Sequence, residues 1–352
     1  MKKLEAKLWK IVEVAKSGDL NEISVKYLED GFGKLFIKYV YDKDMDFLKF
    51  VTTLEDDVKN SRINLIELYE NLYKIYYFHR DLDSAIEFKE SEIKLKAKAK
   101  QDISKDYYEV ANVYYDKGEL GVALEKLKGF FKNTDTTRLT LEKLDLYIKS
   151  LIMQNQLKQD LKFPKDEVLA DLKSLDEVFK KVRTYFKEPE RLSFVVQILY
   201  LYSNHYLSQG EYKVAIKYGQ KAKELLTQNQ VAIKISLKYR IYESLAYAYL
   251  LDKDYERAVD VAKSALKLKN TLLTIDVFSV LTILSEAYLG LGDPDEALNY
   301  AHEANGLVNN SFIKLEYIYE LLAKIYKAKD DEKSTTEYLQ KLCKLQEAVK
   351  KS

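Results

Sequence analysis

The side chains most often used for catalysis are scarce in this chain. Its 352 residues include one cysteine, Cys343, and three histidines, His79, His205 and His302, of which no two are close in sequence. A cysteine nucleophile needs a base beside it, and a zinc site needs several Cys, His or acidic ligands. No phosphate-binding glycine-rich loop and no Gly-x-Ser-x-Gly turn occurs either. We therefore expect no enzymatic activity, no metal and no cofactor, and we expect Cys343 to be buried as a small apolar residue.

Tyrosine is the abundant polar aromatic residue, with 29 copies. Six of them stand nine residues before a small residue at the same point of a predicted helix–turn–helix. This regular spacing indicates that most tyrosines pack between helices with the hydroxyl at the rim, and it argues against a surface that stacks nucleic-acid bases. The pairs are Tyr76 and Ala85, Tyr114 and Ala123, Tyr206 and Ala215, Tyr249 and Ala258, Tyr288 and Ala297, and Tyr326 and Thr335.

The small residues define a repeat. They are separated by 38 residues from Ala85 to Ala123, by 43 from Ala215 to Ala258, and by 39 and 38 in the next two steps. The gap of 92 residues from Ala123 to Ala215 holds two longer units, and Leu48 extends the frame 37 residues before Ala85. Internal periods of this length are typical of stacked supersecondary units, so we expect repeats of 37–46 residues along most of the chain.

The turns agree with this frame. Gly118-Glu119, Gly210-Glu211 and Gly292-Asp293 each place a glycine where a helix ends and an acid where the next begins, as does Gly18-Asp19. Pro294 follows such a turn directly, at the first position of a helix, where proline is favoured. We therefore expect pairs of antiparallel helices.

Composition supports an all-α chain that forms a packed core. Hydrophobic residues make up 47% and charged residues 32%, with only 11 Gly, 3 Pro and a net charge of +1. The near-neutral charge predicts no nucleic-acid surface, and the charged N-terminus is unlike a signal peptide. The longest uncharged stretch, 192–210, contains several polar residues, so we expect no membrane span and place the protein in the cytoplasm.

These repeats resemble the tetratricopeptide repeat, whose period is about 34 residues. The resemblance covers residues 62–130 and 190–345 and implies a right-handed α-solenoid of stacked helix hairpins. We divide the chain into N-terminal hairpins or a cap (1–60), repeats (61–135), an atypical helix pair (136–189), and repeats with a C-terminal capping helix (190–352). The atypical pair, with helices over 137–159 and 165–187, is either a distorted repeat or a hinge.

In tetratricopeptide arrays the first helix of each hairpin lines a concave groove, so its outward residues decide what binds. Asn112 and Asn204 fall at the same repeat position beside Tyr108 and Tyr200, and an asparagine amide can donate to and accept from one peptide unit. Aromatic neighbours would add a rigid wall. The predicted ligand-binding residues are Lys105, Tyr108, Asn112, Tyr200, Asn204, Arg240, Glu243 and Tyr247.

Two other charged features of the sequence bear on what the groove could bind. Glu70 and Lys74 replace the basic clamp of chaperone-binding members of the family, which disfavours recognition of a free C-terminal carboxylate. The lysine run 94–105 is interpreted as a solvated helix face, with a phosphate- or acid-binding patch as the alternative.

The leading functional hypothesis is a non-catalytic scaffold that binds an extended peptide or a partner's helix in the concave groove. The alternative is a peptide-sensing switch, because the chain resembles Rap-type quorum-sensing regulators in length and in its extended repeats. Residues 1–60 would then be the effector region. Acids interleaved through that region make direct DNA binding unfavourable. The partner is therefore expected to be a protein or a peptide, with no nucleic acid, and the oligomeric state is left open.

Overall fold

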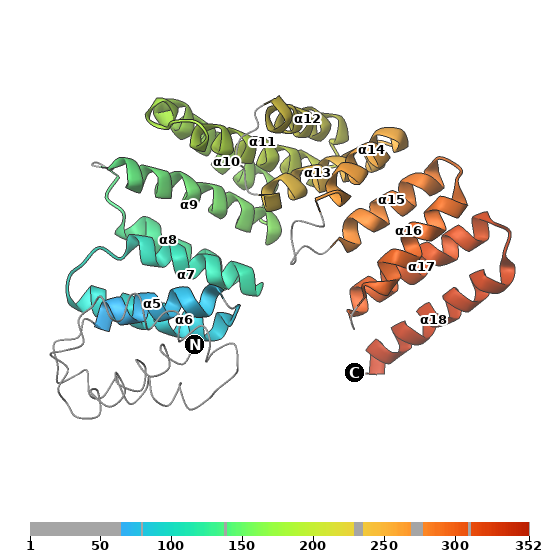
Figure 1. The fold of residues 1–352 in the computed structure, drawn as a ribbon, viewed down its shortest axis with the longest axis horizontal. Coiled ribbons are helices and arrows are strands. Elements are labelled where there is room, and N and C mark those ends of the chain that lie inside the picture. Colours follow the sequence, from blue (N-terminus) through green and yellow to red (C-terminus); the bar gives the residue numbers. More distant parts are fainter. Residues whose placement is uncertain are drawn as a thin grey trace, which may run out of the picture. The chain divides into compact units, whose positions relative to one another are not determined.

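The computed structural model describes residues 65–78, 80–136, 139–228, 235–268, 277–308 and 311–351, and no β-strand occurs within these ranges. The fold is an all-α helical repeat, as predicted (Figure 1). Expectations for residues 1–60, including the turn at Gly18 and the early repeat at Leu48, lie outside the described residues, as does His79.

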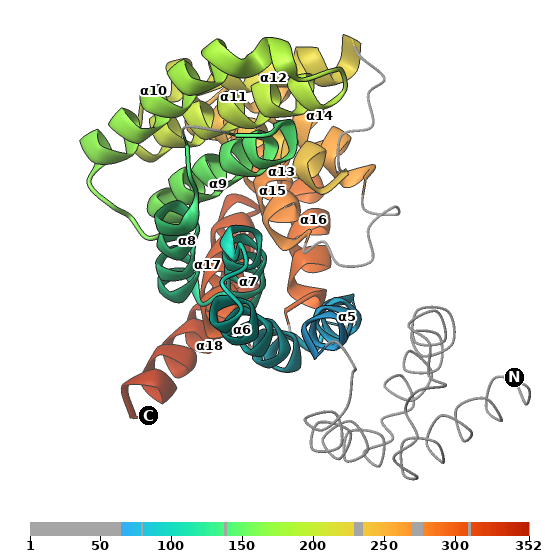
Figure 2. The ribbon, with the colours of Figure 1, turned by 90° about the vertical axis from the view of Figure 1, so that its left-hand side faces the viewer.

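The chain divides into two compact units, residues 1–161 and 162–352. The boundary falls between the two helices of the atypical pair. Consecutive helices pack as antiparallel hairpins within each unit (Figures 1 and 2). The first unit contains α5 (Leu65–Phe78), α6 (Leu82–Lys98), α7 (Ser104–Lys117), α8 (Leu120–Asn133) and α9 (Leu141–Asp160). The second contains α10 (Lys165–Val182), η3 (Arg183–Tyr185), α11 (Glu190–Ser208), α12 (Tyr212–Gln228), α13 (Ile235–Leu251), α14 (Tyr255–Leu266), α15 (Phe278–Gly290), α16 (Pro294–Gly306), α17 (Phe312–Ala328) and α18 (Glu332–Lys351).

Small residues lie at the crossing of each hairpin's two helices. Ala258 and Ala297 are fully buried, as are Ala85, Ala123 and Ala215. In two hairpins a serine of the first helix forms a hydrogen bond to the second helix at the crossing. The Ser203 hydroxyl donates to the carbonyl of Ala215 at 2.9 Å, and the Ser285 hydroxyl donates to the carbonyl of Ala297 at 2.8 Å. A larger side chain at the alanine would separate the helices and break this bond.

The repeated tyrosine stacks on an aromatic ring of the second helix. That ring belongs to the residue three positions after the small residue, and the two rings are nearly parallel. The stacked pairs are Tyr76 with Phe88, Tyr206 with Tyr218, Tyr288 with Tyr300, and Tyr326 with Tyr338, at centroid separations of 5.3, 5.7, 5.6 and 5.6 Å. Where the aromatic partner is missing a cation replaces it: Lys126 lies 5.6 Å above Tyr114, and Arg257 lies 5.0 Å above Tyr249.

One or two residues after each of these first helices ends, the chain contains a residue with left-handed backbone. Gly118, Gly210 and Gly292 take this place as predicted, with φ of 84°, 79° and 79°. The next residue's N–H donates back to the repeated tyrosine, as from Asp293 to the Tyr288 carbonyl at 2.9 Å. Aspartates at this position, such as Asp293, also cap the following helix by accepting from a backbone N–H. In the remaining repeats the left-handed position is held by Arg80, Lys253 and Asp330.

Two expectations from sequence are wrong in detail. Cys343 is exposed, because it lies on the outer side of α18, the last helix, which no further described helix covers. Helix α10 ends at Val182 and passes into η3, short of the predicted Lys187. The residue before a proline avoids helical backbone, and Pro189 accordingly stands at the start of α11.

Candidate functional site

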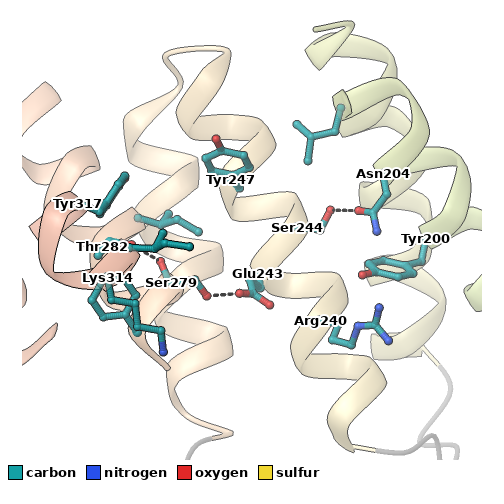
Figure 3. A pocket seen from close by; sticks show the side chains of 14 residues that line it. Tyr200, Asn204, Arg240, Glu243, Ser244, Tyr247, Ser279, Thr282, Lys314 and Tyr317 are labelled. Carbon is teal, nitrogen blue, oxygen red and sulfur yellow. Dashed lines mark hydrogen bonds between the residues drawn. The ribbon is translucent and has the colours of Figure 1, made fainter. Parts of the chain in front are cut away.

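The second unit contains a cavity of about 460 Å³ walled by the first helices of four successive hairpins, α11, α13, α15 and α17 (Figure 3). Its size is within the usual range for small-ligand and peptide pockets. The lining residues are Tyr200, Asn204, Leu207, Arg240, Glu243, Ser244, Tyr247, Phe278, Ser279, Thr282, Ile283, Ile313, Lys314 and Tyr317.

The wall formed by α11 and α13 is held by two contacts. The Arg240 guanidinium lies 5.2 Å from the centroid of the buried Tyr200 ring. One turn further along, the Ser244 hydroxyl donates to the amide oxygen of Asn204 at 2.5 Å. The Asn204 oxygen is therefore used within the protein, whereas its NH₂ group lies on the Tyr200 side of the same wall (Figure 3).

Hydroxyl contacts continue between α13 and α15. The Ser279 hydroxyl donates to the Glu243 carboxylate, and the Thr282 hydroxyl donates to the Ser279 carbonyl at 2.8 Å. Because Glu243 accepts this bond, part of its acceptor capacity is already satisfied. Glu243, Ser279 and Thr282 are thus linked to one another by hydrogen bonds along the cavity lining.

Helix α17 supplies the opposite wall. Tyr317 packs edge-on against Phe278 at 6.4 Å, and its hydroxyl donates to the Glu286 carboxylate. Burial and this bond to Glu286 raise the pKa of Tyr317 above its ordinary value. Burial, with Glu286 nearby, likewise raises the pKa of Tyr247. Both phenols therefore stay neutral at physiological pH. Lys314 lies 5.1 Å above the Phe278 ring, and Ile313 is 78% exposed.

Five of the predicted ligand-binding residues line this one cavity: Tyr200, Asn204, Arg240, Glu243 and Tyr247. Their role in binding stays a prediction. What brings them together is the packing of α11 against α13, which places the outward faces of the first helices side by side.

The other three predicted residues lie on α7, in the first unit. Lys105 is exposed and pairs with Glu109 at 4.0 Å. Asn112 donates to the Tyr108 carbonyl of its own helix at 2.8 Å, and Tyr108 packs edge-on against Phe130 at 6.5 Å. The two asparagines at one repeat position are therefore engaged differently: Asn112 uses its NH₂ group internally, and Asn204 uses its oxygen.

Nine further lining residues were not among the predicted ligand-binding residues, and those on α15 and α17 include Phe278, Ile313, Lys314 and Tyr317. The last of these carried a usable signal. Tyr317 stands eighteen residues before Thr335, as Arg240 does before Ala258 and Ser279 before Ala297. Extending the groove projection to the last repeat would have identified it.

A buried ion cluster between α6 and α7 was also missed. Lys89 is fully buried and lies 2.7 Å from Glu92, 2.6 Å from Glu109 and 3.3 Å from Asp106. Lys96 lies 2.5 Å from Glu92 and 2.9 Å from Asp106. Burial raises the pKa of Glu92, although both lysines oppose this. The cluster joins two successive hairpins. The lysine run is only partly a solvated face, since Lys96 is half-buried and belongs to this cluster.

The structure also places the other charged residues that the sequence analysis singled out, and it bears on the question of a membrane span. Lys94, Lys98 and Lys100 are exposed, as expected for a solvated face. Glu70 and Lys74, at the clamp positions, pair with each other at 2.7 Å. Among the described helices, none has an apolar stretch long enough to cross a bilayer.

Comparison with known proteins identifies the fold. No protein-family model and no curated protein matches the sequence. Among solved structures, the apo form of RapI has a TM-score of 0.61 at 13% identity, with 99% of each chain covered. The anaphase-promoting complex hetero-tetramer Cut9–Hcn1 has a TM-score of 0.57 at 14% identity, covering 91% of this chain and 54% of that chain.

A tetratricopeptide repeat protein from Parabacteroides merdae has a TM-score of 0.50 at 15% identity, covering 82% of this chain and 96% of that chain. At such low identities the similarity establishes fold and nothing finer. The chain has a tetratricopeptide-like helical repeat fold.

Proposed function

We propose that this protein is a non-catalytic interaction scaffold and that the α11–α17 groove holds a segment of a protein or peptide partner. The observation that carries the proposal is the cavity itself, which is open along four first helices and lined by three tyrosines, apolar side chains and a few polar groups. Rigid aromatic walls with sparse polar contacts are typical of recognition sites. Cut9–Hcn1, which shares the fold, is a protein complex.

Selection of a random peptide library on the intact protein, followed by calorimetric titration of the selected peptides, tests this proposal. Tyr247 is 42% exposed within the cavity, so Tyr247→Ala removes contact area without disturbing the core. We expect it to weaken binding by about tenfold, or ~1.4 kcal/mol. Tyr185, on η3 and 66% exposed, does not line the cavity, and Tyr185→Ala is the matched control. Equal affinity for both variants, or no selectable peptide, would reject the groove as the binding site.

A peptide-sensing switch is the second candidate, favoured by the similarity to RapI over nearly the full length of both chains. A selected peptide would then alter a distant part of the molecule by binding one of two conformations better. Hydrogen exchange separates the two functions. A scaffold gains protection only around α11 to α17, whereas a switch also changes exchange rates within residues 1–161.

A further inference from the structure

Resting on the proposed function, we propose that the groove takes an extended peptide segment that places an acidic side chain beside Arg240 and Lys314 and an apolar side chain beside Tyr247. The two ends of the cavity differ in chemistry. Arg240 and Lys314 stand on opposite walls toward the lower end of the view in Figure 3, and Tyr247 stands at the upper end.

The lower end is cationic. Arg240 lies over Tyr200 at 5.2 Å and Lys314 over Phe278 at 5.1 Å. An aromatic face holds a cation in place through its quadrupole and leaves the positive charge intact. Each ring therefore holds a long cationic side chain in place in advance, which lowers the entropy cost of binding an anion beside it.

Glu243 lies between these cations and offsets part of their positive charge. It is the one carboxylate among the fourteen lining residues, against the two cations, so the lining carries a net positive charge. Glu243 also accepts from the Ser279 hydroxyl. The balance of charge favours a carboxylate over an ammonium or guanidinium group on the occupant.

The upper end is apolar. The exposed ring of Tyr247 stands there, and its neutral phenol adds no charge. Leu207 and Ile283 are among the apolar residues that line the same cavity. Between the two ends, the NH₂ group of Asn204 can donate to a backbone carbonyl of the occupant, since its oxygen is held by Ser244. The wall thus offers a charge contact, a backbone contact and an apolar contact in that order.

The geometry of α13 predicts how far apart the acidic and apolar side chains should lie along the bound peptide. Arg240 and Tyr247 are seven residues apart on α13, which at 1.5 Å per residue is about 10.5 Å. An extended chain rises ~3.3 Å per residue, so the acidic and apolar side chains should be about two to four residues apart. A helical occupant would need the same two side chains about seven residues apart.

An array of peptides tests both chemistry and spacing. Acetylated and amidated peptides of Ala, Gly and Ser carry one Glu and one Leu at separations from one to seven residues, with matched series in which Gln or Lys replaces Glu. We expect the Glu series to bind the intact protein best at two to four residues, about tenfold above the Gln series, and the preference to shrink as salt rises. Arg240→Gln and Lys314→Gln should each remove most of the Glu preference, so that the Glu and Gln series bind each variant with similar affinity. Lys324→Gln, which changes an exposed lysine of α17 outside the cavity, is the control and should have no effect.

The other outcomes separate this inference from the function on which it rests. Groove-dependent binding without a Glu preference, or with a Lys preference, would overturn the inference and leave the scaffold function standing. So would a preference for a seven-residue separation, which identifies a helical occupant. Failure of the array and of the random library together would reject both.

Discussion

A residue with left-handed backbone follows the first helix in each of the six described repeats that carry the tyrosine, and glycine takes this place in three of them. Lys253 holds this conformation with φ of 62° and an exposed side chain. A non-glycine residue there costs roughly 1–2 kcal/mol because its Cβ approaches a carbonyl oxygen. The turn is nevertheless kept, since the Asp254 N–H still reaches the Tyr249 carbonyl at 2.9 Å.

Lys253→Gly is therefore expected to raise the free energy of unfolding by about 1 kcal/mol, measured by urea denaturation. The reciprocal change, Gly292→Ala, should lower it by a similar amount, because a Cβ at Gly292 meets no atom within 4 Å and the cost comes from φ of 79° alone. No change in either variant would mean that the repeat ends relax into another turn.

Asn204 is the residue through which the groove hypothesis can be tested most directly. Asn204→Ala removes the NH₂ donor, and we expect a selected peptide to bind ~1–3 kcal/mol more weakly because one of its carbonyls is left unpaired. Stability should fall by no more than about 1 kcal/mol, since Ser244 loses one acceptor at a half-buried site. Asn112→Ala, at the same repeat position in the other unit, is the comparison. Calorimetry with unchanged affinity for Asn204→Ala would place the peptide elsewhere.

At the scale of helices, each hairpin depends on the closeness of its crossing. Ala258 is fully buried where α13 meets α14. Ala258→Leu should force these helices apart and lower stability by ~1–3 kcal/mol, as overpacking of a dense site does. Ala328→Leu adds the same atoms at an exposed position near the end of α17 and should change stability by less than about 0.5 kcal/mol. Equal thermal transitions for the two variants would show that the crossing is placed wrongly.

Between hairpins, the buried ion cluster is the test of how α6 and α7 are joined. Lys89→Met leaves Glu92, Asp106 and Glu109 facing one another with Lys96 alone to balance them, so we expect a loss of about 3–5 kcal/mol. Adding Glu92→Leu should recover part of it, because a buried charge is removed with its partner. Lys98→Met, at an exposed site on the same helix, is the control. A near-neutral single variant in denaturant titration would contradict the burial of this cluster.

For the molecule as a whole, periodic features were predictable from sequence and pairwise ones were not. Residue type and spacing are enough to predict the positions of the repeated alanines and the turns at Gly118, Gly210 and Gly292. Arg80, Lys253 and Asp330 at the same turns escape such rules, because the neighbouring hydrogen bonds impose a conformation that these residue types do not favour.

The residues that line the cavity also fall into a predictable group and an unpredictable group. Residues such as Tyr200 and Arg240 follow from the repeat frame, whereas Phe278 and Lys314 enter through the packing of α15 and α17. The ion cluster of Lys89 depends on a contact between two helices, and the spacing of residues in the sequence does not predict that contact. A single sequence therefore specifies each repeat well, and the contacts between repeats less well.

The last prediction belongs to the whole molecule, because tyrosines with raised pKa values occur in both units. Burial, with Asp81 adding to it, raises the pKa of Tyr76 to about 12, and burial with Glu90 raises that of Tyr114 to about 12. Burial also raises the pKa of Tyr202 in the second unit. In the unfolded chain tyrosine titrates near a pKa of ~10.

Below pH ~10 these tyrosines are protonated in both states, so their contribution to stability is fully present. Above it the unfolded chain loses protons first, and we expect the free energy of unfolding to fall until the folded pKa of about 12 is passed. Tyrosinate absorbance and far-ultraviolet circular dichroism, followed together, should show late-titrating tyrosines that ionise as helix is lost. Tyr76→Phe keeps the ring next to Phe88 and should make the decline shallower. Ionisation of every tyrosine near pH ~10 with the helices intact would contradict the burial of these rings.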